Sequence, residues 1–332
     1  MRYKVNRTPK STNKERAMST LATETPTGAL RVAHFSDTHV LSLDGVQIKD
    51  FLNKRLTGAV NLALNRSKHY RVEVFEQLLD AVVASKPDHA LCTGDLVNLA
   101  LAPEFERVRE LLEARFEAND LTLVPGNHDY YTKEAALAGC FEESFAQYLP
   151  HQLAEPARGS YPVSRVLSNE SGERVVVIGL STAIPTASFM ATGEVGEAQL
   201  SEAQRLLTHE DAEGAFTLLM LHHPLFPEPK RRLDATRRLL DADRLIAELD
   251  QVASTPDLII HGHNHEFKRM ALPTTQTPVI QVGSASRAGS KRAEFHIYVI
   301  HEGALLRVER HIHEPETGRF IACNEAGAPL GG

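Results

Sequence analysis

Three short apolar runs alternate with two segments of helical periodicity in the first half of the chain. The apolar runs cover residues 30–36, 88–93 and 121–124, and the helical patterns cover 70–86 and 104–116. Apolar runs of about four to eight residues are typical of buried strands. Strands that alternate with helices in this way form right-handed crossovers, so the order predicts a parallel sheet covered by helices.

The second half of the chain contains more predicted strands and fewer helices. Strands are expected over residues 161–167, 172–180, 216–224, 278–284, 294–300 and 304–312, and residues 257–265 are expected to form a strand that runs into a His-rich loop. Helices are expected over 197–207 and 234–250. No linker-like composition separates the two halves. We therefore expect one domain over 29–315, between a disordered tail at 1–28 and a C-terminal tail at 316–332.

The composition is that of an ordinary soluble globular protein, with 42% hydrophobic and 24% charged residues. The formal net charge of −7 gives no overall electrostatic reason to bind nucleic acid or an anionic membrane. The three cysteines, Cys92, Cys140 and Cys323, lack the paired spacing of zinc or redox sites. No apolar run approaches the ~20 residues that span a bilayer. A cytoplasmic location is expected.

The first 28 residues are basic and then rich in Ser and Thr, without the apolar run of a signal peptide. We interpret them as a solvated tail. Two alternatives remain open, a transit peptide and translation from Met18.

Polar side chains cluster at the end of, or directly after, five of the predicted strands. The clusters contain Asp37 and His39, then Asp95, then Asn127, His128 and Asp129, then His222 and His223, and finally His263 and His265. Each cluster alone is compatible with an ordinary turn or with packing. In an open α/β sheet, however, the carboxyl ends of the strands line the ligand crevice, so all five loops are expected to converge.

The residue types in these clusters suit divalent metal ions. Imidazole, carboxylate and amide oxygen together favour borderline metals such as Mn, Fe or Zn, and the absence of cysteine ligands argues against a structural zinc finger. The donors are numerous enough for two ions if one carboxylate bridges them. A pair of ions about 3.5–4 Å apart is suited to an in-line phosphoryl displacement.

The order D-x-H, G-D, G-N-H-D, H and G-H-x-H over residues 35–265 resembles the calcineurin-like metallophosphoesterase superfamily. In style the chain is most similar to bacterial class III cyclic-nucleotide phosphodiesterases. The resemblance implies an α/β fold, a four-layer αββα sandwich in which two mixed β-sheets pack face to face with helices on both outer faces.

The same resemblance implies a dinuclear centre that holds two divalent ions, Mn, Fe or Zn. It assigns Asp37, His39 and His265 to one ion and Asn127, His222 and His263 to the other, with Asp95 shared by both. His223 competes with His222 for the ligand role, and His222 is preferred because the family histidine precedes x-Pro. The purple acid phosphatases carry a Tyr shortly after the Gly-Asp motif, where this chain has Asn98, so a Tyr–iron(III) site is not expected.

The resemblance also assigns two residues to catalysis. It implies that His128 contacts the scissile phosphate and protonates the leaving oxygen, and that Asp129 orients His128. The reaction it implies is hydrolysis of a phosphodiester, or of a phosphomonoester or pyrophosphate, by in-line attack of a hydroxide that bridges the two ions. A catalytically silent interaction scaffold is the alternative function.

A basic amphipathic insertion at about 49–71 is the most informative feature for the substrate. It includes Lys54, Arg55 and Arg66, and leucine or valine recurs at every fourth residue. One interpretation is a helix packed on the domain with solvated charges. The other is a cap that binds an anionic or lipid-linked phosphoester and makes peripheral contact with a membrane.

The predicted substrate-binding residues are Lys54, Arg55, Arg66 and His223. The substrates considered are a cyclic nucleotide, a phospholipid headgroup and a UDP-linked lipid pyrophosphate. No nucleic-acid partner is expected, because the sequence has no extended basic stripe.

Overall fold

The computed structural model describes residues 25–47, 55, 70–156, 159–227, 234–251, 253, 255–289 and 291–330, whose strands form two six-stranded sheets. The first contains β1 (Leu30–Phe35), β2 (His89–Cys92), β3 (Leu121–Leu123), β10 (Glu294–His301), β11 (Ala304–Glu314) and β12 (Arg319–Cys323), in the order β12-β11-β10-β1-β2-β3. The second contains β4 (Val163–Ser168), β5 (Arg174–Gly179), β6 (Phe216–Met220), β7 (Leu258–His261), β8 (Lys268–Ala271) and β9 (Pro278–Gln281), in the order β4-β5-β6-β7-β9-β8.

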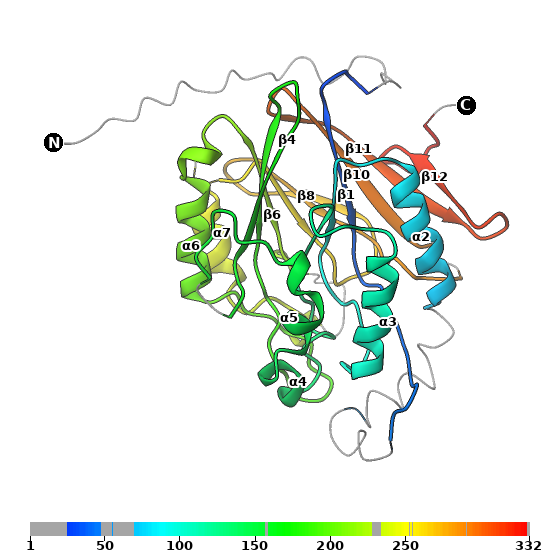
Figure 1. Ribbon diagram of the computed structural model, residues 1–332. Coiled ribbons are helices and arrows are strands. Elements are labelled where there is room, and N and C mark those ends of the chain that lie inside the picture. Colours follow the sequence, from blue (N-terminus) through cyan, green and yellow to red (C-terminus); the bar gives the residue numbers. More distant parts are fainter. Residues whose placement is uncertain are drawn as a thin grey trace.

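Helices cover the two outer faces of the paired sheets. They are α2 (Val72–Ala84), α3 (Ala102–Glu113), α4 (Lys133–Leu137), α5 (Cys140–Phe145), α6 (Glu197–Leu207) and α7 (Ala242–Leu249), with short 3-10 turns at Ala146–Tyr148, Glu210–Ala212 and Asp234–Thr236. In Figure 1, α6 and α7 lie outside the second sheet and α2 and α3 lie outside the first. The predicted four-layer αββα sandwich is confirmed.

Both sheets are mixed, as predicted. In the first sheet β1, β2 and β3 are parallel neighbours, and β10 joins β1 in the antiparallel sense. In the second sheet β5, β6, β7 and β9 are parallel, while β4 and β8 are antiparallel edge strands. Parallel strands point their carboxyl ends in one direction, which brings the loops after them to one end of each sheet.

The strand β5 is apolar on both of its faces, and both faces are buried. Successive side chains of a strand point to opposite faces. Val175 and Val177 are buried in the core between the sheets, while Val176 and Ile178 are buried in the core beneath α6 and α7. Such strands are apolar throughout because helices and a second sheet cover both faces.

The helix α3 begins at Ala102, two residues before the predicted segment 104–116. Pro103 stands in its first turn, where a missing N–H costs nothing. The buried carboxylate of Glu104 accepts the backbone N–H groups of Leu99 and Leu101 at 2.9 and 3.0 Å. These contacts fix the loop that leads from β2 into the helix.

The expected end of the domain at residue 315 is wrong, because the first sheet continues past it. The strand β12 pairs with β11 along five registered residue pairs, from Arg310 with Cys323 to Glu314 with Arg319. Gly318, with a φ of +69°, takes the left-handed conformation of the turn between the two strands. The pairing buries Cys323 and gives this segment a place in the fold.

The predicted tail and insertion lie largely outside the described residues. Residues 25–28 of the tail are described, and the carbonyl of Gly28 accepts a hydrogen bond from Asn169 at 2.9 Å. In the insertion only Arg55, Tyr70 and Arg71 are described.

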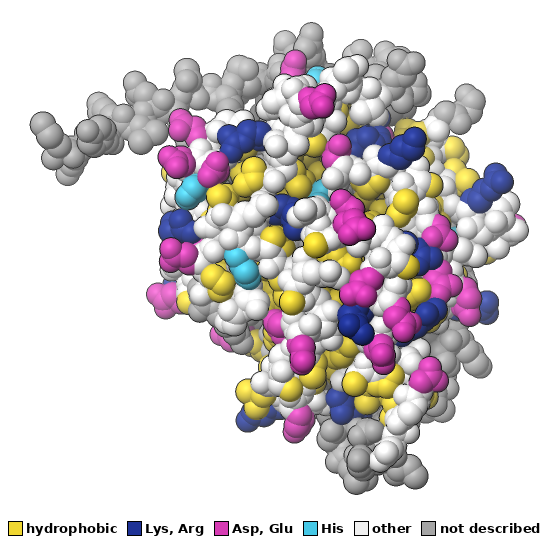
Figure 2. Space-filling model, viewed as in Figure 1, with side chains coloured by type: hydrophobic (Ala, Val, Ile, Leu, Met, Phe, Trp, Pro, Cys, Tyr) yellow, Lys and Arg dark blue, Asp and Glu magenta, His cyan; other side chains and the backbone are white. Residues whose placement is uncertain are grey.

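Acidic and basic side chains are interspersed over the described part of the face drawn in Figure 2. This distribution agrees with the modest net charge of −7. Among the described helices, none combines the length and the apolar character needed to cross a membrane.

Candidate metal centre

The predicted polar clusters occupy the loops that leave the carboxyl ends of strands from both sheets. Asp37 and His39 follow β1, Asp95 follows β2, Asn127 follows β3, His222 follows β6, and His263 and His265 follow β7. Six of these side chains form two buried groups, and within each group the ligand atoms lie within 4.8 Å of one another. The predicted convergence of these six side chains is therefore observed.

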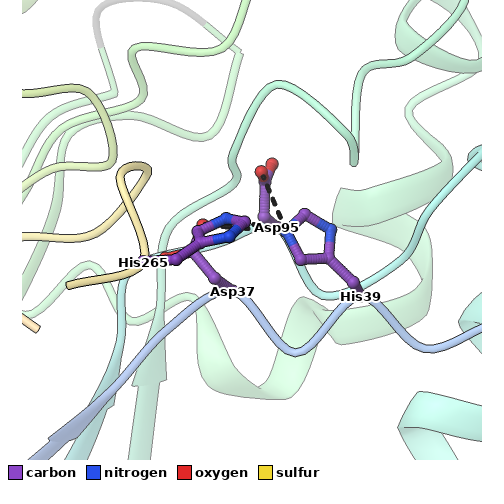
Figure 3. Close-up of side chains that lie close together, drawn as sticks. All are labelled: Asp37, His39, Asp95 and His265. Carbon is purple, nitrogen blue, oxygen red and sulfur yellow. Dashed lines mark hydrogen bonds and ion pairs between the residues drawn. The ribbon is translucent and has the colours of Figure 1, made fainter. Parts of the chain in front are cut away.

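The first group brings Asp37, His39 and His265 together with Asp95. Nε2 of His265 lies 3.0 Å from Oδ1 of Asp37 and 3.1 Å from Nε2 of His39. The four side chains point toward one another, Asp37 and His39 from the loop after β1 and the other two from the loops after β2 and β7 (Figure 3). Two imidazole nitrogens and two carboxylates at this spacing form a suitable set of donors for a divalent ion.

The second group contains Asp95, His222 and His263. Nε2 of His222 lies 3.4 Å from Oδ2 of Asp95 and 3.2 Å from Nδ1 of His263. The same Oδ2 lies 3.8 Å from Nε2 of His39 in the first group. Asp95 therefore stands between the two groups, as expected of a carboxylate shared by two ions.

Asn127 has the remaining predicted ligand atom. Its side-chain Oδ1 is buried and has no hydrogen-bond partner in the described structure. The next residue, His128, donates its backbone N–H to Oδ1 of Asp95 at 2.7 Å, which ties this loop to the shared carboxylate. A buried acceptor without a donor costs about 1–3 kcal/mol, and a cation beside it would remove that cost. The donors present thus fit a dinuclear centre, and Asn127 as a ligand stays a prediction.

Five of the seven predicted ligand residues have a left-handed backbone. The φ angles are +57° at Asp37, +45° at His39, +54° at Asp95, +74° at His263 and +59° at His265. This conformation is uncommon outside glycine, and strained residues cluster at functional sites. The backbone N–H groups of Asp37, His39 and His263 donate hydrogen bonds to residues of other loops, which holds these three positions in place.

The motifs require glycine at three positions because neighbouring loops approach the backbone too closely there to leave room for a side chain. A Cβ atom on Gly126 would lie 2.8 Å from Cγ of Asp95, and one on Gly262 would lie 2.7 Å from Cβ of Ser36. Gly94 has a φ of +88°, and its Cβ would lie 2.8 Å from Cα of Gly126. Any side chain at these positions would displace a loop that carries ligands.

Residues 30–267 match the family described as Calcineurin-like phosphoesterase, which is more than half of the chain. The chain belongs to this family. The predicted resemblance is thereby confirmed, and the ligand geometry above is that of a metallophosphoesterase with buried His and Asp groups.

Two relatives are similar to this phosphoesterase over most of its length. The chain is 26% identical over 259 residues to glycerophosphodiester phosphodiesterase GpdQ of Enterobacter lignolyticus, a match that covers 76% of this chain and 78% of the relative. It is 23% identical over 218 residues to a probable cyclic nucleotide phosphodiesterase of a Synechococcus strain, covering 63% and 71%. The crystal structure of a dimetal phosphatase from Danio rerio has a TM-score of 0.55 at 14% identity, covering 86% of this chain and 96% of that one, and shows the shared fold.

The predicted role of Asp129 is wrong. Its carboxylate accepts four backbone N–H groups, with donor–acceptor distances of 2.8–3.1 Å; the donors are Asp95, Leu96, Val97 and Gly126. Asp129 therefore fixes the loop that carries the shared ligand Asp95. Burial, together with the charge of Asp95, raises the pKa of Asp129 to about 7.

His128 is oriented by other groups. Its Nδ1 lies 2.6 Å from the carbonyl oxygen of Asn98, so Nδ1 carries a proton. The ring of Tyr131 stacks on the imidazole with centroids 5.4 Å apart, and the ring of His39 lies edge-on at 4.8 Å. His128 is thus held beside the first group of ligands.

The charges of the centre depend on one another. Burial alone would raise the pKa of Asp95, but His222, His128 and His39 together hold it well below its usual value. Burial would likewise lower the pKa of His222, yet the carboxylate of Asp95 raises it to about 9. For His263, burial and the nearby Arg237 hold the pKa well below its usual value. The electrostatics favour an ionised Asp95 beside imidazole donors.

The structure distinguishes between the two adjacent histidines. His222 donates from Nδ1 to the carbonyl of Thr93 at 2.6 Å, which turns Nε2 toward Asp95. His223 is fully buried, with Nδ1 2.7 Å from the Thr182 hydroxyl and Nε2 3.2 Å from the Ala191 carbonyl. The preference for His222 agrees with this geometry. The prediction that His223 binds substrate is wrong, because its ring is fully buried and both of its nitrogens form hydrogen bonds within the fold.

Of the other predicted substrate-binding residues, only Arg55 is among the described residues. The guanidinium of Arg55 donates to the backbone carbonyls of Leu99 and Ala100, which follow the shared ligand loop. Arg55 thus supports that loop from outside. Lys54 and Arg66 lie outside the described residues, and their role stays a prediction.

Sequence reasoning missed one residue that supports the ligands. The hydroxyl of Tyr70 lies 2.8 Å from Nδ1 of His265, and its ring is edge-on to His39 at 4.8 Å. Such a contact fixes the tautomer and orientation of a metal-binding histidine. Tyr70 lies at the end of the basic insertion, and no local pattern marks it.

Proposed function

We propose that this phosphoesterase is a phosphodiesterase that hydrolyses small organic phosphodiesters at two divalent ions, Mn, Fe or Zn. The observation that carries the proposal is the sharing of Asp95 by two buried groups of His and Asp side chains. Two ions held in this way would supply Lewis acidity and a water nucleophile for an in-line displacement at phosphorus.

His128 would handle the proton of the reaction. Because the Asn98 carbonyl accepts from Nδ1, the neutral imidazole presents Nε2 as an acceptor and the charged form presents it as a donor. A charged His128 can neutralise a phosphate oxygen and protonate the leaving alcohol. The stacked ring of Tyr131 would keep this imidazole in place during turnover.

A diester is favoured over a monoester because the pocket beside the ligands leaves room for a second ester arm. It has a volume of about 610 Å³ and begins at His39, Tyr70 and Asn98. Pockets of about 300–1,000 Å³ are typical of small-molecule sites. The two similar proteins are both named as phosphodiesterases, which supports the same choice.

The test is hydrolysis by metal-free protein to which Mn, Zn, Fe or Co is restored. We expect bis(p-nitrophenyl) phosphate to be cleaved faster than p-nitrophenyl phosphate. Asp95→Ala and Asn127→Ala should abolish this activity, while Asp243→Ala, an exposed position on α7, should leave it unchanged. Rates that stay the same in both site variants, or a preference for the monoester, would contradict the proposal.

The natural substrate requires a wider comparison. Cyclic nucleotides, glycerophosphodiesters and UDP-linked lipids assayed side by side would rank the classes. A chain that binds two ions but cleaves none of the diesters would instead be a silent scaffold.

A further inference from the structure

The pocket beside the metal centre has an inner end at the ligands and an outer end at the edge of the first sheet. The inner end is formed by His39, Tyr70 and Asn98, which contact or belong to the ligand set. The outer end reaches the turn between β11 and β12 at Pro315 and Gly318. A molecule that extends from the centre would therefore run along the start of α2.

Three arginines also line this pocket. Arg71, Arg287 and Arg292 form no ion pair or hydrogen bond through their side chains in the described structure. Several other arginines of the described structure are paired, as Arg115 is with Asp80 at 2.8 Å. A guanidinium is suited to binding phosphate or carboxylate oxygens in a bidentate manner. One acidic residue, Glu73, also lines the pocket, so cations outnumber anions there by three to one.

Backbone contacts hold two of these arginines close to the metal ligands. The N–H of Arg71 donates to the carbonyl of Ser286 at 3.0 Å, and Tyr70 and Arg287 form an antiparallel bridge. Tyr70 in turn contacts His265 through its hydroxyl. The cationic stretch is thereby fixed relative to the site of hydrolysis.

The third arginine marks the outer end. Arg292 and His313 both line the pocket, and burial together with the charge of Arg292 lowers the pKa of this histidine. Nε2 of His313 lies 3.1 Å from Oε1 of Gln77 on α2. The outer end thus combines a cation with a neutral imidazole and an amide.

We propose that this pocket binds an ester arm that carries a second phosphate group, and that Arg71, Arg287 and Arg292 recognise that phosphate. This proposal rests on the proposed function. The diester phosphorus would lie at the metal ligands and the second phosphate along the arginines. These residues determine specificity and take no part in breaking the bond. The preferred substrate is then a phosphodiester with a phosphorylated arm, of the kind found in nucleoside bisphosphates.

Two matched substrates test this proposal. Thymidine 5′-(p-nitrophenyl phosphate) and its 3′-phosphorylated form differ by one phosphate. We expect the phosphorylated substrate to have a kcat/KM about 10-fold higher, and Arg287→Met or Arg292→Met to lower that preference about 10-fold, mainly through KM, the effect of one charge-assisted hydrogen bond. Arg109→Met on α3 removes the same charge outside the pocket and should leave the preference unchanged.

The failure of this proposal can be distinguished from failure of the proposed function. Equal kcat/KM for both substrates, or a preference that survives Arg287→Met, overturns the phosphate subsite while diester hydrolysis stands. If no diester is hydrolysed, the phosphate subsite can still be tested by comparing the equilibrium binding of thymidine 3′,5′-bisphosphate and thymidine 5′-monophosphate. The bisphosphate should bind about 10-fold more tightly to the wild type, and Arg287→Met should remove the difference. Equal binding to the wild type overturns the proposal.

Discussion

Gly126→Ala should disrupt the metal centre through a single methyl group. The new Cβ would lie 2.8 Å from Cγ of Asp95 and closer still to its Oδ1. Real Cβ atoms essentially never approach other atoms within 3.0 Å, so Asp95 or the loop must move. Overpacking of this kind costs about 1–3 kcal/mol. In a domain of this size that corresponds to a fall in melting temperature of roughly 2–4 °C per kcal/mol.

The effect on metal binding should exceed the effect on stability. A shift of a shared ligand should weaken metal affinity by about 10–100-fold, the range seen when residues that support metal ligands are changed. Gly179→Ala is the matched control, because its Cβ would meet Val163 and Val124 at 2.6 and 2.8 Å, at the ends of apolar side chains in the core. Both variants should unfold at lower temperature.

Competition with a chelator measures the affinity, and thermal unfolding of the metal-free proteins measures the stability. Only Gly126→Ala should lose affinity. The reasoning is refuted if both glycine variants bind metal as tightly as the wild type, or if both lose affinity equally.

Asp129→Asn should lower the melting temperature and the metal content together, since each backbone N–H left without its acceptor costs about 1–3 kcal/mol; unchanged values of both would contradict the loop-fixing role. Elemental analysis should find one ion fewer in His222→Ala, whereas His223→Ala should keep both ions and unfold at lower temperature; the opposite pattern would exchange their roles. Burial, with the charge of Arg165, lowers the pKa of His89 from 6.5 to about 3. Between these two pH values the unfolded chain binds a proton at this histidine that the folded chain does not bind. The free energy of unfolding should therefore fall as the pH drops through this range, by up to about 5 kcal/mol. His89→Gln should make the free energy of unfolding less dependent on pH when it is measured by urea unfolding between pH 4 and 7. An unchanged pH dependence would show that His89 is not its source.

The convergence of the candidate ligands could be predicted because strand ends are visible in the sequence. Asp37, Asp95 and His263 each follow a short apolar run, and parallel strands bring such positions together without further information. Their residue types then limit the chemistry to divalent metals. The left-handed backbone at these positions has no signature in the sequence, since it arises from contacts with other loops.

The role of Asp129 could not be inferred from the motif. Its partners are backbone N–H groups of another loop, and every residue except proline has such a group. The sequence therefore does not indicate which donors will face the carboxylate. For the same reason the motif does not indicate that the partner of His128 is the carbonyl oxygen of Asn98.

Other features of the fold and of the pocket could not be predicted because they depend on pairing between residues far apart in the sequence. The strand β12 has only five residues, and β11 supplies the pairing that places it in the first sheet. The arginines of the pocket come from the start of α2 and from the segment between β9 and β10. Residues 70 and 287 meet through a backbone bridge more than two hundred positions apart, which no local periodicity reveals.

The sharing of Asp95 by two ions can be tested directly by anomalous diffraction from crystals grown with Mn. Two peaks about 3.5–4 Å apart should lie on either side of the Asp95 carboxylate. One should be bound by Asp37, His39 and His265, and the other by Asn127, His222 and His263. A single peak, or a second peak bound by other residues, would contradict the dinuclear centre.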